Sequence, residues 1–323
     1  MTVAAKDNSL PRRVLKKAGL ALLTVFVALC LASIALQRFR AMVGWTTHAV
    51  AEVNIAGRTV AMWKPAGPSP PDGYPVILFS HGLAGCGTQS IFLTEDLAQA
   101  GYLVLAPEHH DAGCGPRHEG ALFAKLATVQ AEAAFRKPYE WSEATYRDRG
   151  ADLEATLDAI LTERSFDGVP IDSNRVGLAG HSLGGYTVLA LAGAWPSWKD
   201  KRIKAVLALS PYCAPFIRKG DLRHLDLPVM YQGGTFDFGI TPSVRRPGGA
   251  YDLSSSPKYF LELAGAGHFA WTNLNKSYQP IITDYARAFF DHYLKGTDNP
   301  DPLGRLTARP WPKDVDSLRY SLQ

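Results

Sequence analysis

Ser182 is the residue best placed to act as a nucleophile, because it lies in a G-x-S-x-G pattern, Gly180-His181-Ser182-Leu183-Gly184. An apolar run over 176–179 precedes the pattern, and mainly small and apolar residues follow it over 186–192. Strand, serine and helix in this order predict a turn so sharp that the serine oxygen stands clear of the backbone. Glycines flank the serine because a Cβ atom there would collide with the turn or with a neighbouring strand.

A serine hydroxyl needs a base to take its proton, and the base needs a carboxylate to hold it in place. Asp237 follows the apolar run 227–232, and His268 follows the run 259–263. If these runs are parallel strands, both side chains lie at the sheet edge that presents Ser182. We therefore predict Ser182 as the nucleophile, His268 as general base and then acid, and Asp237 as the orienting carboxylate.

Each assignment has a simpler alternative. Asp237 could be a turn residue in a glycine-rich loop, and His268 could be a capping or packing histidine. Other carboxylates are worse placed relative to a strand end: Asp221, Asp226 and Asp252. His181, next to the serine, is expected to pack beneath the turn and not to take part in the chemistry.

Attack of a serine on an acyl carbon creates an oxyanion, which needs hydrogen-bond donors. The backbone N–H of Leu183 begins a helix, where N–H groups are free, and the N–H of Leu83 follows the first long strand. We expect these two amides to form the oxyanion hole. His81, Phe269 and Trp271 are the candidates for lining the substrate pocket.

The run Glu108-His109-His110-Asp111 contains residue types that bind metals. In an extended segment adjacent side chains point in opposite directions, and no second ligand group stands out in the sequence. We favour a structural role for this run and expect neither a metal nor a cofactor. The competing hypothesis is a metal-dependent hydrolase that uses His109 and His110.

Apolar runs alternate with helical patterns along most of the chain. We expect a hairpin over 51–64, strands over 74–80, 102–107, 203–210, 227–232 and 259–263, and helices over 91–101, 147–163 and 281–294. Continuous apolar strands that alternate with helices indicate an α/β fold with a mainly parallel sheet covered on both faces. Residues 41–323 are expected to form one catalytic domain.

Two segments depart from this alternation. Residues 112–145 carry apolar side chains at near-helical spacing, which fits either a lid over the site or a surface helix. Residues 296–323 are rich in Pro and Asp at their start and are expected to form a surface tail.

Residues 1–40 have the pattern of an export signal or a membrane anchor. Basic residues precede an apolar stretch over 19–36, whose length fits either a long signal or a short spanning helix. We favour an uncleaved anchor that places the folded part on the far side of the membrane; the alternative is a cleaved signal and a secreted protein. The net charge of +4 comes from this segment, so nucleic-acid binding is not expected.

Three cysteines follow the apolar segment. Cys86 and Cys114 lie in loops after strands expected to be neighbours, and in an oxidising compartment they could pair. Cys213 would then be free.

These motifs resemble a known family. Ser80-His81-Gly82-Leu83, the Ser182 pattern, the Gly-x-x-Asp ending at Asp237 and the segment 261–269 are similar to the α/β-hydrolases that include platelet-activating-factor acetylhydrolases, bacterial cutinases and dienelactone hydrolase-like proteins. The resemblance covers about residues 51–300 and implies an α/β-hydrolase fold with an insertion before the nucleophile. It differs from dienelactone hydrolases, which use a cysteine nucleophile, and from cutinases, which have a shorter 112–145 segment.

The resemblance implies a serine esterase or lipase that cleaves a small-molecule or lipid carboxylic ester without a cofactor, through an acyl-enzyme intermediate. Two alternatives remain at this point. An acyltransferase would use the same residues but pass the acyl group to an alcohol. A membrane-tethered binding protein would keep the hydrolase fold without the activity.

Overall fold

A ten-stranded sheet forms the centre of the fold in the computed structural model, which describes residues 50–113, 135–296 and 302–323. The strands are β1 (Ala51–Ile55), β2 (Arg58–Trp63), β3 (Tyr74–Ser80), β4 (Leu103–Pro107), β5 (Ser165–Phe166), β6 (Val169–His181), β7 (Ile203–Leu209), β8 (Val229–Gly234), β9 (Lys258–Leu263) and β10 (Val315–Ser321). Their order is β1-β2-β4-β3-β6-β7-β8-β9-β10, with β5 paired to β6.

The six central strands run parallel to one another. β4, β3, β6, β7, β8 and β9 pair in parallel, whereas β2 pairs with β4, and β10 with β9, in antiparallel fashion. Every residue of β3 and β4 is buried, which is why their sequences are unbroken apolar runs. The carboxyl ends of all six strands consequently meet at one edge of the sheet.

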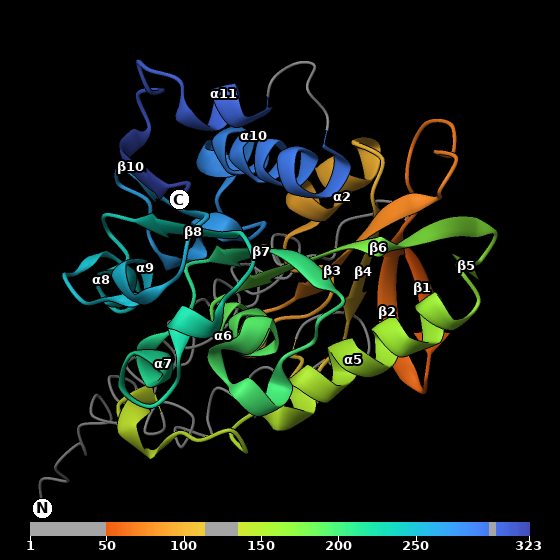
Figure 1. The fold of residues 1–323 in the computed structure, drawn as a ribbon, viewed down its shortest axis with the longest axis horizontal. Coiled ribbons are helices and arrows are strands. Elements are labelled where there is room, and N and C mark those ends of the chain that lie inside the picture. Colours follow the sequence, from red (N-terminus) through yellow and green to blue (C-terminus); the bar gives the residue numbers. More distant parts are fainter. Residues whose placement is uncertain (1–49, 114–134, 297–301) are drawn as a thin grey trace, which may run out of the picture. The chain divides into compact units, whose positions relative to one another are not determined.

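Helices cover both faces of the sheet (Figure 1). One face carries α2 (Ile91–Gln99), α10 (Gln279–Phe290) and α11 (Pro302–Thr307), and the other carries α5 (Arg147–Thr162), α6 (Leu183–Leu189) and α7 (Ala214–Arg218). Two short helices, α8 (Thr241–Arg245) and α9 (Ala250–Leu253), lie between β8 and β9. Separate apolar clusters fill the two sides, as expected for a sheet buried on both faces.

The end of the chain differs from the expected surface tail. Val315–Ser321 is a strand that pairs antiparallel with β9, and α11 precedes it. The alternation in this segment is weak because β10 is an edge strand, with Val315 and Leu318 buried and most of its other residues in contact with water. Composition at the start of the segment therefore gave a wrong prediction for its end.

Two predictions from the sequence fall outside the described residues. These are the apolar segment 19–36 and most of the segment 112–145. Within the described ranges, no helix is both long enough and apolar enough to span a bilayer.

Candidate active site

Ser182 lies at the junction of β6 and α6 in a conformation that few non-glycine residues adopt. Its φ is 56° and its ψ is −115°, and its N–H donates to the carbonyl oxygen of Leu209 at 3.0 Å. A strained serine between a strand and a helix is the geometry of a nucleophile elbow. The predicted turn is thus present.

The glycines around Ser182 allow three pieces of backbone to come together. A Cβ atom on Gly180 would lie 2.4 Å from the carbonyl oxygen of Gly184, and one on Gly184 would lie 1.9 Å from that of Ser80. Neither distance is compatible with a side chain. These two glycines therefore let α6 lie directly against the ends of β3 and β6.

The structure brings the three predicted catalytic side chains together. The Nε2 atom of His268 lies 3.0 Å from the Oγ atom of Ser182. On the other side of the ring, Nδ1 lies 3.3 Å from Oδ1 and 3.4 Å from Oδ2 of Asp237. The His268 side chain is 27% exposed and that of Asp237 only 3%, so the imidazole is accessible and the carboxylate is shielded.

Asp237 is held as a carboxylate by its neighbours. Burial acts to raise its pKa, but the hydrogen bond and charge of His268, with hydrogen bonds from Ser210 and Thr241, outweigh burial and lower that pKa below its ordinary value. The Thr241 hydroxyl donates to Oδ2 at 3.1 Å. An ionised Asp237 can fix the Nδ1–H tautomer of His268, which leaves Nε2 free to accept the Ser182 proton.

Ser210, which sequence reasoning missed, also touches this group. It is fully buried at the end of β7, donates to Oδ2 of Asp237 and lies 2.8 Å from Nδ1 of His268. The sequence did contain a signal. The strand that ends at this serine lies between the strands of Ser182 and Asp237, so its last residue had to reach the same edge.

His181 packs beneath the turn, as expected, and connects two loops of the site. Its Nδ1 accepts from the Gln89 amide at 3.0 Å, and its Nε2–H donates to the His268 carbonyl at 2.9 Å. The Gln89 oxygen in turn accepts from the Gly82 N–H at 2.9 Å. Burial and the nearby His268 lower the pKa of His181 to about 3, so the ring is neutral and its tautomer is fixed.

The loop with the first predicted oxyanion donor follows β3. Leu83 in this loop is 38% exposed, and Leu183 is the first residue of α6. Among the described residues, no hydrogen bond from either amide to a protein acceptor is found. Arg149 of α5 is fully buried, pairs with Asp111 and donates to the His81 carbonyl, so it anchors this loop from below.

A second Ser–His–Asp chain lies beside the first. The Ser80 hydroxyl is 2.9 Å from Nε2 of His109, whose Nδ1 is 2.9 Å from Oδ2 of Asp152. Ser80 is fully buried, so no acyl carbon can reach its oxygen. Burial and nearby positive groups, first among them Arg149, hold the pKa of His109 well below its usual range. The Ser80–His109–Asp152 hydrogen bonds therefore form a buried support for the loop after β3.

The side chains of the run 108–111 reach different partners. Glu108 accepts from the Gly87 N–H at 3.0 Å, His109 belongs to the buried chain above, His110 pairs with Asp148, and Asp111 pairs with Arg149. Within the described ranges, no group of three or more His, Cys, Asp or Glu side chains is arranged to hold a metal ion.

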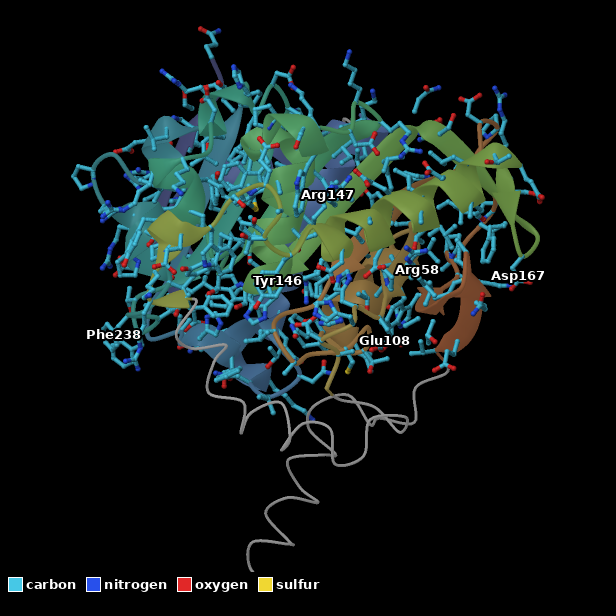
Figure 2. All side chains as sticks on the ribbon, turned by 90° about the horizontal axis from the view of Figure 1, so that it is seen from below. Arg58, Glu108, Tyr146, Arg147, Asp167 and Phe238 are labelled. Carbon is cyan, nitrogen blue, oxygen red and sulfur yellow. The ribbon has the colours of Figure 1, made fainter. Side chains whose placement is uncertain are left out.

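One of the predicted pocket residues is exposed and the other two are buried. Phe269 is 60% exposed beside His268, and Phe236 and Phe238 flank Asp237 with rings 5.8 Å apart. Phe238 projects outward from the loop after β8 (Figure 2). Trp271, however, is fully buried and donates to Gln232, and His81 is fully buried between Gly82 and His109. The prediction that Trp271 and His81 line an open pocket was therefore wrong.

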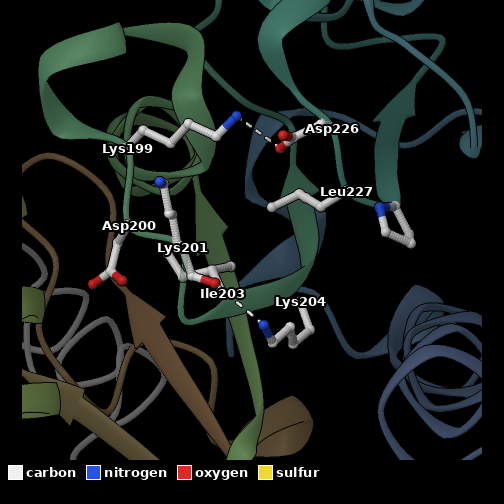
Figure 3. Close-up of a pocket in the computed structure, with 8 residues that line it drawn as sticks. Lys199, Asp200, Lys201, Ile203, Lys204, Asp226 and Leu227 are labelled. Atoms are coloured by element: carbon white, nitrogen blue, oxygen red, sulfur yellow. Dashed lines mark hydrogen bonds and ion pairs between the residues drawn. The ribbon is translucent and has the colours of Figure 1, made fainter.

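A distinct cavity of about 380 Å³ lies at the other edge of the sheet (Figure 3). It is lined by Lys199, Asp200, Lys201, Ile203, Lys204, Asp226, Leu227 and Pro228. Ile203 begins β7 and Pro228 precedes β8, so the cavity is at the amino ends of these strands. Ser182 and its partners are at the carboxyl ends, and this cavity is not part of their site.

Of the two cysteines among the described residues, one forms a disulfide and the other is free. Cys86 is disulfide-bonded, whereas Cys213 is free and buried, which raises the pKa of its thiol to about 12. Cys114, the partner considered from the sequence, lies outside the described residues.

Sequence comparisons match the chain to hydrolases. A family described as "Alpha/beta hydrolase family" matches residues 77–320, and one described as "Platelet-activating factor acetylhydrolase, isoform II" matches residues 33–117. The cutinase est1 of Thermobifida alba is 31% identical over 53% of this chain and 54% of its own length. The platelet-activating factor acetylhydrolase of Cavia porcellus is 26% identical over 44% of this chain and 36% of its own length. The chain thus matches about half or less of the length of these relatives.

Proposed function

Because the chain belongs to the alpha/beta hydrolase family, we propose that it is a serine hydrolase that cleaves carboxylic esters through an acyl-enzyme intermediate. The observation that carries this proposal is the 3.0 Å contact between Oγ of Ser182 and Nε2 of His268, at a strained turn between a strand and a helix. The similarity to cutinases and to a platelet-activating factor acetylhydrolase supports an ester as the substrate class.

In the first half of the proposed reaction, Nε2 of His268 takes the Ser182 proton as the serine oxygen attacks the acyl carbon. The buried Asp237 carboxylate balances the positive charge that forms on the ring. The N–H groups of Leu83 and Leu183 stabilise the oxyanion. His268 then gives its proton to the leaving alcohol, and the acyl group stays on Ser182.

In the second half, the same groups act on water. His268 takes a proton from a water molecule, whose oxygen attacks the acyl carbon, and then returns a proton to Ser182. The carboxylic acid leaves and the serine is restored. Both halves of the reaction thus use the same residues, namely Ser182, His268, Asp237 and the two backbone amides.

The site fits an ester with an apolar acyl part. Phe269 follows the catalytic histidine directly, and its ring centroid lies 5.6 Å from that of His268. Its side chain is 60% exposed, so it can cover apolar surface on a bound substrate. We propose that it contacts the acyl chain and that short and medium acyl esters are the substrates.

A graded panel of p-nitrophenyl esters tests this function. The wild-type protein is expected to hydrolyse them, and Ser182→Ala is expected to lose this activity while it keeps its fold. Ser69→Ala, which changes an exposed serine, is the matched control and should retain full activity. If Ser182→Ala hydrolysed these esters as fast as the wild type, the proposal would be rejected.

We propose that the protein is exported. The basic residues before the apolar segment 19–36 support this location, and so does the disulfide at Cys86, because disulfides persist in oxidising compartments. The segment either stays as an anchor or is removed as a signal. Cell fractionation followed by sequencing of the mature N-terminus distinguishes the two, and recovery of the protein with reduced Cys86 in the cytoplasm would contradict export.

A further inference from the structure

Four neighbouring strands of the sheet each deliver one polar side chain to the site. Ser182 follows β6, Ser210 follows β7, Asp237 follows β8 and His268 follows β9. The proposed reaction uses three of these residues. Ser210 has no role in it, although it lies between the strands that carry the nucleophile and the carboxylate.

The shortest contact of the His268 Nδ1 atom is with Ser210. The Ser210 Oγ atom lies 2.8 Å from Nδ1, whereas the Asp237 oxygens lie at 3.3 and 3.4 Å. An N–H···O hydrogen bond is normally 2.7–3.2 Å long. The Ser210 oxygen lies within this range, whereas both carboxylate oxygens lie slightly beyond it, so the contact of Nδ1 with Asp237 is the longer and weaker one.

The direction of each hydrogen bond follows from the groups around the carboxylate. An ionised carboxylate only accepts hydrogen bonds, so the Ser210 hydroxyl donates its proton to Oδ2 of Asp237. The lone pairs of the Ser210 oxygen then face Nδ1 of His268. Nδ1 consequently carries the proton and donates a hydrogen bond to the Ser210 oxygen.

We propose that Ser210 is a positioning residue that links His268 to Asp237, accepting from Nδ1–H and donating to the carboxylate. This inference rests on the proposed function, in which His268 is the base that activates Ser182. Ser210 acts through the imidazole and does not touch the reacting acyl group. It sets the tautomer and orientation of His268. Its hydrogen bond to Asp237 polarises the Ser210 hydroxyl, which makes the Ser210 oxygen a better acceptor for Nδ1–H.

The backbone holds Ser210 firmly in this position. Its φ is 42°, in the left-handed region that residues other than Gly, Asn and Asp rarely adopt. Its N–H donates to the Gln232 carbonyl at 2.7 Å, and its side chain is fully buried. A strained backbone at a buried hydroxyl is consistent with a position fixed for a function.

Kinetics of the full-length protein test the proposal. Ser210→Ala removes the hydroxyl at nearly constant volume and is expected to lower kcat for a p-nitrophenyl ester about 10-fold to 100-fold with KM nearly unchanged. Ser210→Gly relieves the positive φ, so it folds readily and should show the same loss. Ser210→Thr keeps the hydroxyl and should recover most of the activity.

Two further variants separate positioning from mere stability. Ser254→Ala removes another buried serine hydroxyl, whose hydrogen bonds go to Tyr231 and the Ala250 carbonyl and not to Ser182, Asp237 or His268, and should leave kcat unchanged. In an Asp237→Ala background, Ser210→Ala should lower kcat little further, because residues that act as one unit do not have additive effects. Additive losses in the double variant would overturn the proposal.

A spectroscopic measurement tests Ser210 independently of activity. The Nδ1–H proton resonance of His268, identified by its loss in His268→Gln, should shift in Ser210→Ala and stay in place in Ser254→Ala. An unchanged resonance in Ser210→Ala would overturn the role of Ser210. If the resonance shifts but the wild type hydrolyses no ester, the proposed function fails and the Ser210 contact stands.

Discussion

At the scale of single residues, the site depends on which hydrogen bond each polar atom donates or accepts. Asp237 accepts hydrogen bonds from the hydroxyls of Ser210 and Thr241, and it faces the Nδ1 side of His268. This leaves Nε2 facing the Ser182 hydroxyl, whose proton we propose that it accepts. The hydroxyl of an ordinary serine becomes a nucleophile only because this order of donors and acceptors is fixed in advance.

Asp237→Asn tests this order. The amide keeps the shape of the side chain but removes the charge and offers N–H groups, so it favours the wrong tautomer of His268. We expect kcat to fall about 10³-fold to 10⁴-fold. Asp252→Asn, at a carboxylate that the sequence made a weaker candidate, should leave kcat within about twofold of the wild type. Equal losses in both variants would remove Asp237 from its assigned role.

At the scale of elements, parallel strands and one closely packed helix assemble the site. β6, β8 and β9 end at the same edge of the sheet, so residues far apart in sequence meet there. α6 can begin directly at Ser182 because glycines allow it to contact the end of β3. The loop after β3 is then held from the opposite side by the buried Arg149.

Gly184→Ala tests this close packing. The added Cβ would lie 1.9 Å from the Ser80 carbonyl oxygen, so α6 or β3 must move. We expect a loss of about 3 kcal/mol or more in the free energy of unfolding, together with a large loss of activity. Gly239→Ala is the matched control, because nothing lies within 4 Å of its Cβ position. Denaturant unfolding of both variants provides the measurement, and a neutral Gly184→Ala would refute the packing argument.

The sequence predicted most of the central elements because they are regular. β3, β4 and β7 are mainly apolar runs, interrupted in β7 only by the exposed Lys204, and the turn at Ser182 has a distinctive glycine pattern. β10 could not be predicted in this way, since an edge strand buries only part of its residues.

The missed parts of the site depend on contacts between distant segments. Ser210 and Asp152 have no local motif, and each acquires its role only when another strand or helix packs beside it. Trp271 shows the reverse case, because an aromatic residue near a catalytic histidine also fits the core. Pattern alone does not say which side of a short helix faces the sheet.

At the scale of the whole molecule, buried histidines link pH to stability. The pKa of His181 falls from 6.5 to about 3 on folding, so the unfolded chain binds a proton more readily. Its contribution to stability is therefore complete above about pH 6.5 and is lost as the pH falls toward 3. The lowered pKa of His109 acts in the same direction.

Unfolding at different pH values tests this linkage. His181 alone should make the free energy of unfolding about 2 kcal/mol lower at pH 5 than at pH 8. His181→Gln should reduce this dependence by about that amount, whereas Ser69→Ala, at an exposed residue that does not titrate, should leave it unchanged. If His181→Gln kept the full wild-type dependence, the neutral buried ring would not be its source.

We expect Ser182, and not the buried Ser80, to become acylated. The direct measurement is peptide mapping by mass spectrometry after reaction with a fluorophosphonate. One adduct is expected, on the peptide that contains Ser182, and none is expected in Ser182→Ala. An adduct on the Ser80 peptide, or none on well-folded wild-type protein, would contradict it.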